Sequence, residues 1–92
     1  MRNYPEEKGS VVINGHQMSW ILRRSKGESA FGIRGSRIFE LTIMKDGKEV
    51  AKYNKGWDAS NPPSAHDNET KLCIDHLIQT FGREKKKVKE SN

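Results

Sequence analysis

The chain contains one cysteine, three prolines and no long apolar run. A single cysteine excludes an internal disulfide and is typical of proteins in a reducing compartment. No segment approaches the roughly 18 consecutive apolar residues that a membrane-spanning helix needs, and the first residues, MRNYPEEKGS, contain no apolar signal segment. We therefore expect a cytoplasmic protein that does not enter a membrane.

Catalytic and metal-binding patterns are also scarce. The three histidines, His16, His66 and His76, do not have chelating spacing with a third ligand. Cys73 and His76 are three residues apart in a predicted helix, but no third group is evident that would orient the histidine as a base. We therefore predict no enzyme activity, no metal and no cofactor, and we interpret Cys73 as a small buried residue.

Ninety-two residues with a hydrophobic fraction of 33% permit one small domain. We expect a flexible N-terminus over residues 1–8, a single domain over 9–82 and a basic disordered tail over 83–92. The tail has five basic and two acidic residues, so it carries +3 of the formal net charge of +5. Residues 9–82 have ten basic and eight acidic residues, which leaves +2. This charge allows nucleic-acid binding but does not imply it.

The first hairpin is predicted by Asn14-Gly15 between two apolar segments. Both central positions of a type I′ turn need a positive φ, which Asn and Gly tolerate. The two-residue turn pairs Ile13 with His16 and Val11 with Met18. One face of this hairpin then carries Val11, Ile13, Met18, Trp20 and Leu22, and the other carries Gln17, Ser19 and Arg23.

The second hairpin surrounds Lys45-Asp46-Gly47. A two-residue turn would place Leu41 opposite Lys52, a poor match. A three-residue loop with Gly47 in the left-handed conformation instead pairs Phe39 with Tyr53, Leu41 with Ala51 and Glu40 with Lys52. We predict the three-residue loop.

A helix is predicted over residues 65–81, after the irregular segment that ends in Pro62 and Pro63. Ser64 is a suitable N-cap, and Gly82 is suitable just past the helix end. The apolar stripe at helical spacing consists of Cys73, Ile74, Leu77, Ile78 and Phe81.

These elements predict an α+β fold, in which a four-stranded antiparallel sheet of two hairpins packs one face against one C-terminal amphipathic helix. We expect the sheet to contribute to the core Val11, Ile13, Met18, Trp20, Leu22, Phe39, Leu41, Ile43, Ala51 and Tyr53. An exposed edge strand would allow a weak homodimer, so we expect a monomer or a weak homodimer.

A glycine-rich basic loop lies between the hairpins. Its segment Phe31 to Ile38, FGIRGSRI, matches the Gly-x-x-Gly loop of K-homology domains, which clamps single-stranded nucleic acid. In that family the loop joins two helices, whereas here the following residues alternate as a strand. The favoured interpretation is that Gly32 and Gly35 form tight bends.

Basic residues flank this loop, and Trp57 follows the second hairpin in Gly56-Trp57-Asp58. For any one cation a solvating role is favoured, and for Trp57 a ring at the edge of the core. Together they form the only candidate contact surface, because Trp and Arg dominate interface hot spots. The candidate binding residues are Arg23, Arg24, Arg34, Gly35, Arg37 and Trp57.

Residues 9–58 resemble a family of short uncharacterised proteins from bacteria, phages and mobile elements. The matching residues are Phe31-Gly32-Ile33, Gly35, Arg37-Ile38, Leu41, Ile43, Asp46-Gly47-Lys48, Val50-Ala51, Tyr53 and Gly56-Trp57-Asp58. Ser36 stands where that family usually has a second glycine, and Asn54 where an Asp is common. The resemblance implies a small antiparallel sheet with a helix and implies no activity.

We therefore expect a small non-enzymatic binding module that docks on a host protein or protein complex through Arg34, Arg37 and Trp57. Arg23 and Arg24 would add electrostatic attraction. The alternative is direct nucleic-acid binding by the sheet face or by the loop Gly32-Ile33-Arg34-Gly35. The two differ in salt dependence, because nucleic-acid affinity falls steeply with salt.

Overall fold

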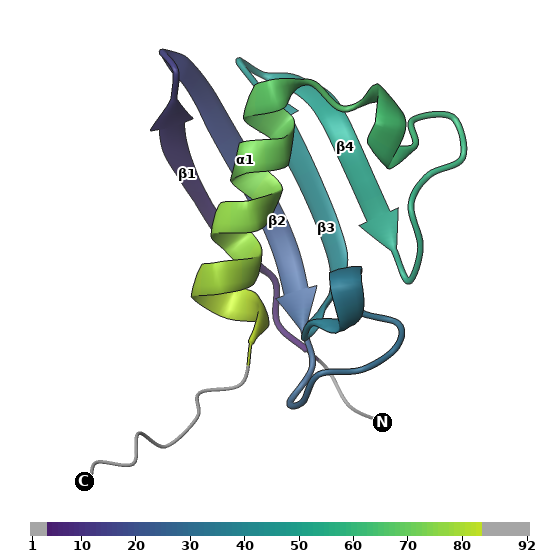
Figure 1. Ribbon diagram of the computed structural model, residues 1–92. Coiled ribbons are helices and arrows are strands. Elements are labelled where there is room, and N and C mark those ends of the chain that lie inside the picture. The colour runs from purple at the N-terminus through teal and green to yellow at the C-terminus, as the bar shows by residue number, and fades with distance from the viewer. Residues whose placement is uncertain (1–3, 84–92) are drawn as a thin grey trace, which may run out of the picture.

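The computed structural model describes residues 4–83. Its strands are β1 (Glu7–Ile13), β2 (His16–Arg24), β3 (Ile38–Lys45) and β4 (Lys48–Asn54), and its α-helix is α1 (Asn68–Leu77). The strands form one antiparallel sheet in the order β1-β2-β3-β4, and α1 lies across one face of it (Figure 1). The predicted α+β fold is confirmed. β1 begins two residues before the expected domain boundary, and residues 84–92 of the expected tail lie outside the described part of the chain.

The first hairpin has the predicted register. Ile13 pairs with His16 and Val11 with Met18, around a turn in which Asn14 and Gly15 have φ values of 51° and 82°. The indole of Trp20 lies over Gly9 of β1, where a Cβ atom would come within 2.5 Å of the ring. The small residue in β1 therefore lets a large aromatic side chain lie flat on the sheet.

The predicted register of the second hairpin is wrong. Lys45 pairs directly with Lys48 across a two-residue Asp46-Gly47 turn, and the pairing shifts between Ile43 and Met44. The extra residue is therefore Val50 in β4, beyond the turn. This bulge places Tyr53 opposite Leu41 and Ala51 opposite Ile43, so that the four side chains lie in the core.

A second bulge lies between β2 and β3. Arg23 pairs with Glu40 and Arg24 with Ile38, so Phe39 is the extra residue. Ile38 is fully buried, whereas Phe39 packs its ring against Tyr4. The expectation that Phe39 belongs to the core is therefore wrong, because the bulge turns it to the other face of the sheet.

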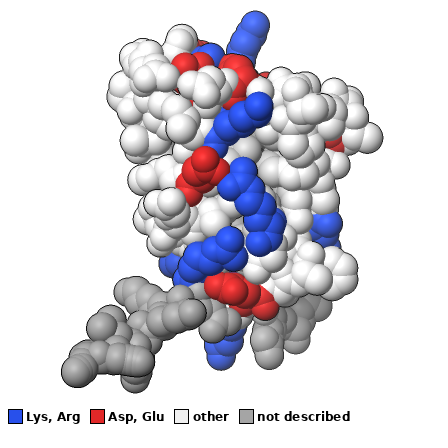
Figure 2. All heavy atoms as spheres, viewed as in Figure 1, with Lys and Arg blue, Asp and Glu red and all other residues white. Residues whose placement is uncertain are grey.

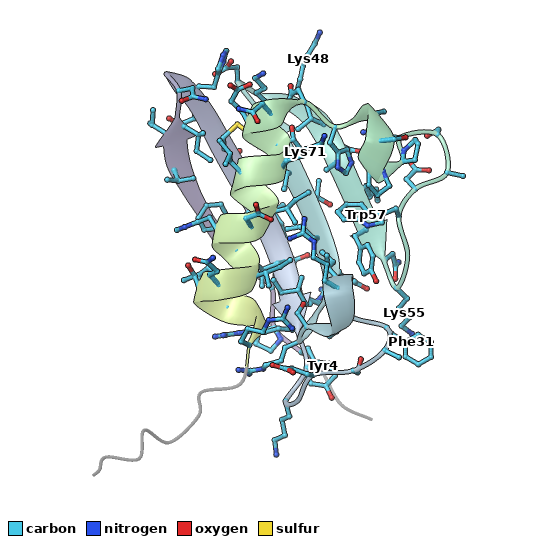
Figure 3. All side chains as sticks on the ribbon, viewed as in Figure 1. Tyr4, Phe31, Lys48, Lys55, Trp57 and Lys71 are labelled. Atoms are coloured by element: carbon cyan, nitrogen blue, oxygen red, sulfur yellow. The ribbon has the colours of Figure 1, made fainter. Side chains whose placement is uncertain are left out.

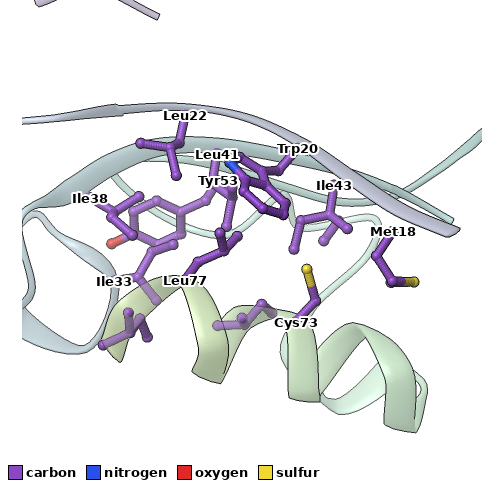
Figure 4. Packing of buried hydrophobic residues seen from close by; sticks show 13 residues of the cluster. Met18, Trp20, Leu22, Ile33, Ile38, Leu41, Ile43, Tyr53, Cys73 and Leu77 are labelled. Atoms are coloured by element: carbon purple, nitrogen blue, oxygen red, sulfur yellow. The ribbon is translucent and has the colours of Figure 1, made fainter. Parts of the chain in front are cut away.

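The core lies between α1 and one face of the sheet (Figure 4). Ile33 from the glycine-rich loop and Ile38 belong to it, although neither was expected there. Val11, Ile13 and Phe81 are only partly buried at its margin. The buried apolar residues are Met18, Trp20, Leu22, Ile33, Ile38, Leu41, Ile43, Ala51, Tyr53, Cys73, Ile74, Leu77 and Ile78.

The helix begins later than predicted. Pro63–Ala65 forms a separate 3₁₀ turn, and the N-cap of α1 is Asp67, not Ser64. The Asp67 carboxylate accepts a hydrogen bond from the Thr70 N–H at 2.9 Å and another from the Lys45 ammonium at 2.9 Å. At the other end, α1 continues into a π-helical turn over Ile78–Gly82. Within residues 4–83, no helix combines the length and the apolar character needed to cross a bilayer.

We expect Asp67 to stabilise the fold in a pH-dependent way. Its hydrogen bonds to Lys45 and Thr70 lower the pKa of the carboxyl from 3.8 to about 2. The folded protein therefore favours the charged carboxylate more than the unfolded chain does. This contribution to stability is present above pH 3.8 and is lost as the pH falls toward 2. Asp67→Asn keeps a capping oxygen but loses the charge, whereas Asp67→Ala removes the cap and should cost about 0.5–2 kcal/mol.

Urea unfolding followed by tryptophan fluorescence tests this prediction. The difference in unfolding free energy between wild type and Asp67→Asn should be largest near neutral pH and shrink in acid. A difference that does not change with pH would contradict the assigned role of the carboxylate.

Candidate binding surface

The predicted arginines of β2 form ion pairs within the chain. The Arg23 guanidinium contacts the Glu40 carboxylate at 2.8 Å and the Glu6 carboxylate at 3.4 Å. Arg24 Nε contacts the Glu7 carboxylate at 2.8 Å, and its guanidinium carbon lies 5.2 Å from the centre of the Phe81 ring. These two side chains therefore join the N-terminal residues and the helix end to the sheet.

The arginines of the glycine-rich loop are also engaged. The Arg34 guanidinium forms an ion pair with Asp75 of α1, and Arg37 Nε donates to the Ser25 carbonyl at 2.9 Å. Figure 2 shows that basic and acidic side chains alternate along the helix side of the molecule and do not form one basic patch. That these arginines bind a partner stays a prediction. Arg34 is already paired with a carboxylate, whereas the Arg37 side chain donates to a backbone carbonyl.

The glycines of the loop meet structural demands. A Cβ atom on Gly32 would lie 1.7 Å from the Ser36 carbonyl oxygen, and Gly35 has a φ of 73°. Buried Ser36 in turn contacts Gly82 at the end of the helix, where a Cβ atom would come within 3.0 Å of its side chain. Because the chain continues into strand β3 and not into a helix, the loop lacks the setting of a K-homology domain.

We expect Gly32→Ala to destabilise the protein. The added methyl group would overlap the Ser36 carbonyl, and such overpacking costs about 1–3 kcal/mol. Gly56→Ala is the matched control, because a Cβ atom there meets nothing within 4 Å. Thermal unfolding should show a lower Tm for Gly32→Ala and little change for Gly56→Ala. Equal Tm values for the two variants would contradict the proposed close approach.

Trp57 lies at the edge of the core. Its ring packs edge-on against Tyr53 and against His66, with 4.9 Å between ring centres in each pair. Burial lowers the pKa of His66, which favours the neutral imidazole. The remaining face of Trp57 borders an open cavity of about 470 Å³ together with Lys52, Asn54, Gly56 and Asp58. Trp57 is thus both part of the packing and partly accessible.

The most exposed aromatic side chain is Phe31, at 64% of its maximal surface. Its ring borders a cavity of about 350 Å³, and the residues that line this cavity are Tyr4, Ser25, Ser29, Phe31, Phe39 and Lys55. We call Tyr4, Phe31, Phe39 and Lys55 the aromatic end. Figure 3 shows Phe31 and Lys55 close together, with Trp57 further along the same side of the molecule.

The fold holds the aromatic end in place through the backbone. Tyr53 Oη donates to the Phe31 carbonyl at 2.8 Å, and the Lys55 N–H donates to the Phe39 carbonyl at 2.9 Å. Lys55 itself adopts a left-handed conformation with a φ of 58°. The Tyr4 and Phe39 rings pack edge-to-face, 5.3 Å apart. The backbone is therefore anchored while the Phe31 ring stays in solvent.

The sequence pointed to Trp57 as a contact residue and to the loop that begins at Phe31, but not to Tyr4, Phe39 or Lys55. Tyr4 falls in the expected frayed N-terminus, and the bulge that exposes Phe39 has no local turn signal. The arrangement can bind an apolar or aromatic group in the cavity and place one positive charge beside it, because aromatic rings supply large contact area at low conformational cost.

Cys73 does not have the surroundings of a nucleophile. The side chain is fully buried, and burial raises the pKa of the thiol to about 11. The His76 ring packs against Trp20, with 6.1 Å between ring centres. Among residues 4–83, no three histidine, cysteine or carboxylate side chains are grouped closely enough to hold a metal ion.

We expect the Cys73 thiol to react very slowly with a disulfide reagent in the folded protein. With a pKa of about 11, only about one thiol in ten thousand is ionised at pH 7. The reaction should become fast when urea unfolds the chain. Rapid stoichiometric reaction of the native protein at neutral pH would contradict this assignment and revive a catalytic role.

The fold and the surface define a small α+β protein with one covered and one open sheet face. The chain belongs to the family described as Domain of unknown function (DUF7678), whose model matches residues 6–82. No curated protein and no solved structure matches it.

Proposed function

We propose that the protein is a small non-enzymatic binding module, of phage or mobile-element origin, that docks on a host protein. The docking surface is the aromatic end together with Trp57, and the basic glycine-rich loop lies beside it. The single observation that carries this proposal is Phe31, a large apolar side chain exposed on an anchored backbone beside a cavity. Exposed aromatic anchors of this kind dominate protein interfaces.

The charges around the aromatic end favour a protein over nucleic acid. Among residues 4–83, Lys55 is the only cation that lines the cavity, and Arg23, Arg24 and Arg34 are paired with carboxylates. A nucleic-acid site needs several cations for successive phosphates. A protein partner needs only an apolar side chain for the cavity and an acidic group for Lys55.

Nucleic-acid binding remains the second candidate because of one specific observation. The exposed Phe31 ring and the partly buried Tyr4 ring border the same cavity as Lys55, and bases stack on such platforms beside a cation. The affinity for nucleic acid should fall steeply as the salt concentration rises, and it should survive the removal of any one charged pair of side chains.

The test begins with a pull-down of the tagged full chain from a bacterial lysate, with and without nuclease treatment. Binding of the captured partner is then measured with purified variants. Phe31→Ala should weaken binding by roughly 30-fold, since hot-spot residues contribute about 2 kcal/mol. Lys55→Ala should weaken it less and make it less sensitive to salt.

Leu72→Ala is the matched control, because Leu72 is an exposed apolar residue on α1 outside the aromatic end. Its affinity should equal that of the wild type. Equal losses in Phe31→Ala and Leu72→Ala would exclude the aromatic end as the docking surface. Capture that nuclease treatment abolishes would instead favour nucleic acid.

A further inference from the structure

The two edges of the sheet differ in whether other residues cover the backbone groups of the edge strand. Along β4, the chain turns back and covers the outward-facing backbone groups. The Asp58 N–H donates to the Lys52 carbonyl at 3.1 Å, and the Asn54 N–H donates to the Gly56 carbonyl at 2.9 Å. The Asn61 side chain donates to the Val50 carbonyl, so this edge is closed to another strand.

The β1 edge has no such cover. Ile13 and His16 flank a two-residue turn and form a hydrogen-bonded pair, so alternate residues of β1 point their backbone groups away from β2. These residues are Lys8, Ser10 and Val12. No described residue pairs with their backbone groups, and β1 is the outermost strand (Figure 1).

The margin of this edge is apolar. Val12 is 64% exposed on the open face of the sheet. Val11 and Ile13 alternate with Val12 along the strand and are only partly buried against the core. An uncovered strand with apolar side chains along it is a template for pairing.

We propose that β1 pairs with β1 of a second copy of the chain, antiparallel and about a two-fold axis through Ser10. Ser10 is the midpoint of the strand and carries outward-facing backbone groups. A two-fold axis there pairs every residue from Glu7 to Ile13 and satisfies the free groups of all three outward-facing residues. The two sheets become one continuous sheet with both helices on the same face.

This register also suits the side chains. It places Lys8 opposite Val12 of the second copy, so no like charges face each other. It places Val11 opposite Gly9 of the second copy, over which the Trp20 indole of that copy lies. A two-fold axis through Lys8 would instead place two lysines face to face. The strand is therefore complementary to itself, which favours a second copy over an unrelated extended segment.

Sedimentation velocity of the full chain over a concentration series tests the proposal. The wild type should show a concentration-dependent dimer. Val12→Lys should weaken dimerisation about tenfold or more, because each introduced lysine would face Lys8 of the other copy and apolar contact would be lost. Asn54→Lys is the matched control, because it adds the same charge to the exposed face of the covered edge strand. It should dimerise like the wild type.

A charge exchange tests the register. In the double variant Lys8→Glu, Val12→Lys, each introduced carboxylate faces an introduced ammonium on the other copy, so dimerisation should return. A wild type that stays monomeric, a Val12→Lys variant that dimerises like Asn54→Lys, or a double variant that stays dissociated would each overturn the proposal. Phe31→Ala should leave the dimer unchanged, so this result is independent of the docking function.

Discussion

One helix covers one face of a four-stranded sheet, and this constraint shapes the rest of the protein. A chain of 92 residues with a hydrophobic fraction of 33% has enough large apolar side chains for one such layer and no more. The open face and one sheet edge are therefore left to solvent, and the chain closes the other edge with its own segment around Trp57. The two surfaces that we propose for partners lie where this cover ends.

Tyr53 links the covered core to the aromatic end. Its ring lies in the core opposite Leu41 and packs against Trp57, while its hydroxyl holds the Phe31 carbonyl. Burial raises the pKa of this hydroxyl, so it stays protonated and able to donate. One side chain thus positions two of the four aromatic residues that we assign to docking, Phe31 and Trp57.

Local signals in the sequence were sufficient for some elements and not for others. The Asn14-Gly15 turn and the alternation around it predicted the first hairpin residue by residue, because turn and pattern agree there. The predicted register of the second hairpin was wrong because the bulge at Val50 depends on which side chains fill the core, and no turn residue marks that bulge. The predicted helix start was wrong because Ser64 and Asp67 are both suitable N-caps, and only the contacts of Asp67 with Lys45 and Thr70 decide between them.

The candidate site was predictable only in part, for a related reason. Arg34 and its partner Asp75 are 41 positions apart in the sequence, and Arg23 lies 17 from both Glu6 and Glu40. Ion pairs between residues so far apart in the sequence form only in the folded chain. The sequence therefore showed a cluster of arginines without showing their carboxylate partners. The residues around Phe31 were missed because a bulge and an N-terminal segment bring them together.

The paired arginines still bear on how a partner binds. The Arg34 and Asp75 side chains are 55% and 48% exposed, and ion pairs in such surroundings contribute about 0–1 kcal/mol. If Arg34 exchanged Asp75 for a carboxylate of a partner, the free energy of binding would therefore change little in either direction. In the proposed docking, such weak pairs would not drive association, but they would select among partners that the aromatic residues bind. In the docking that we propose, affinity would reside in Phe31 and its cavity, and charge would decide which protein is accepted there.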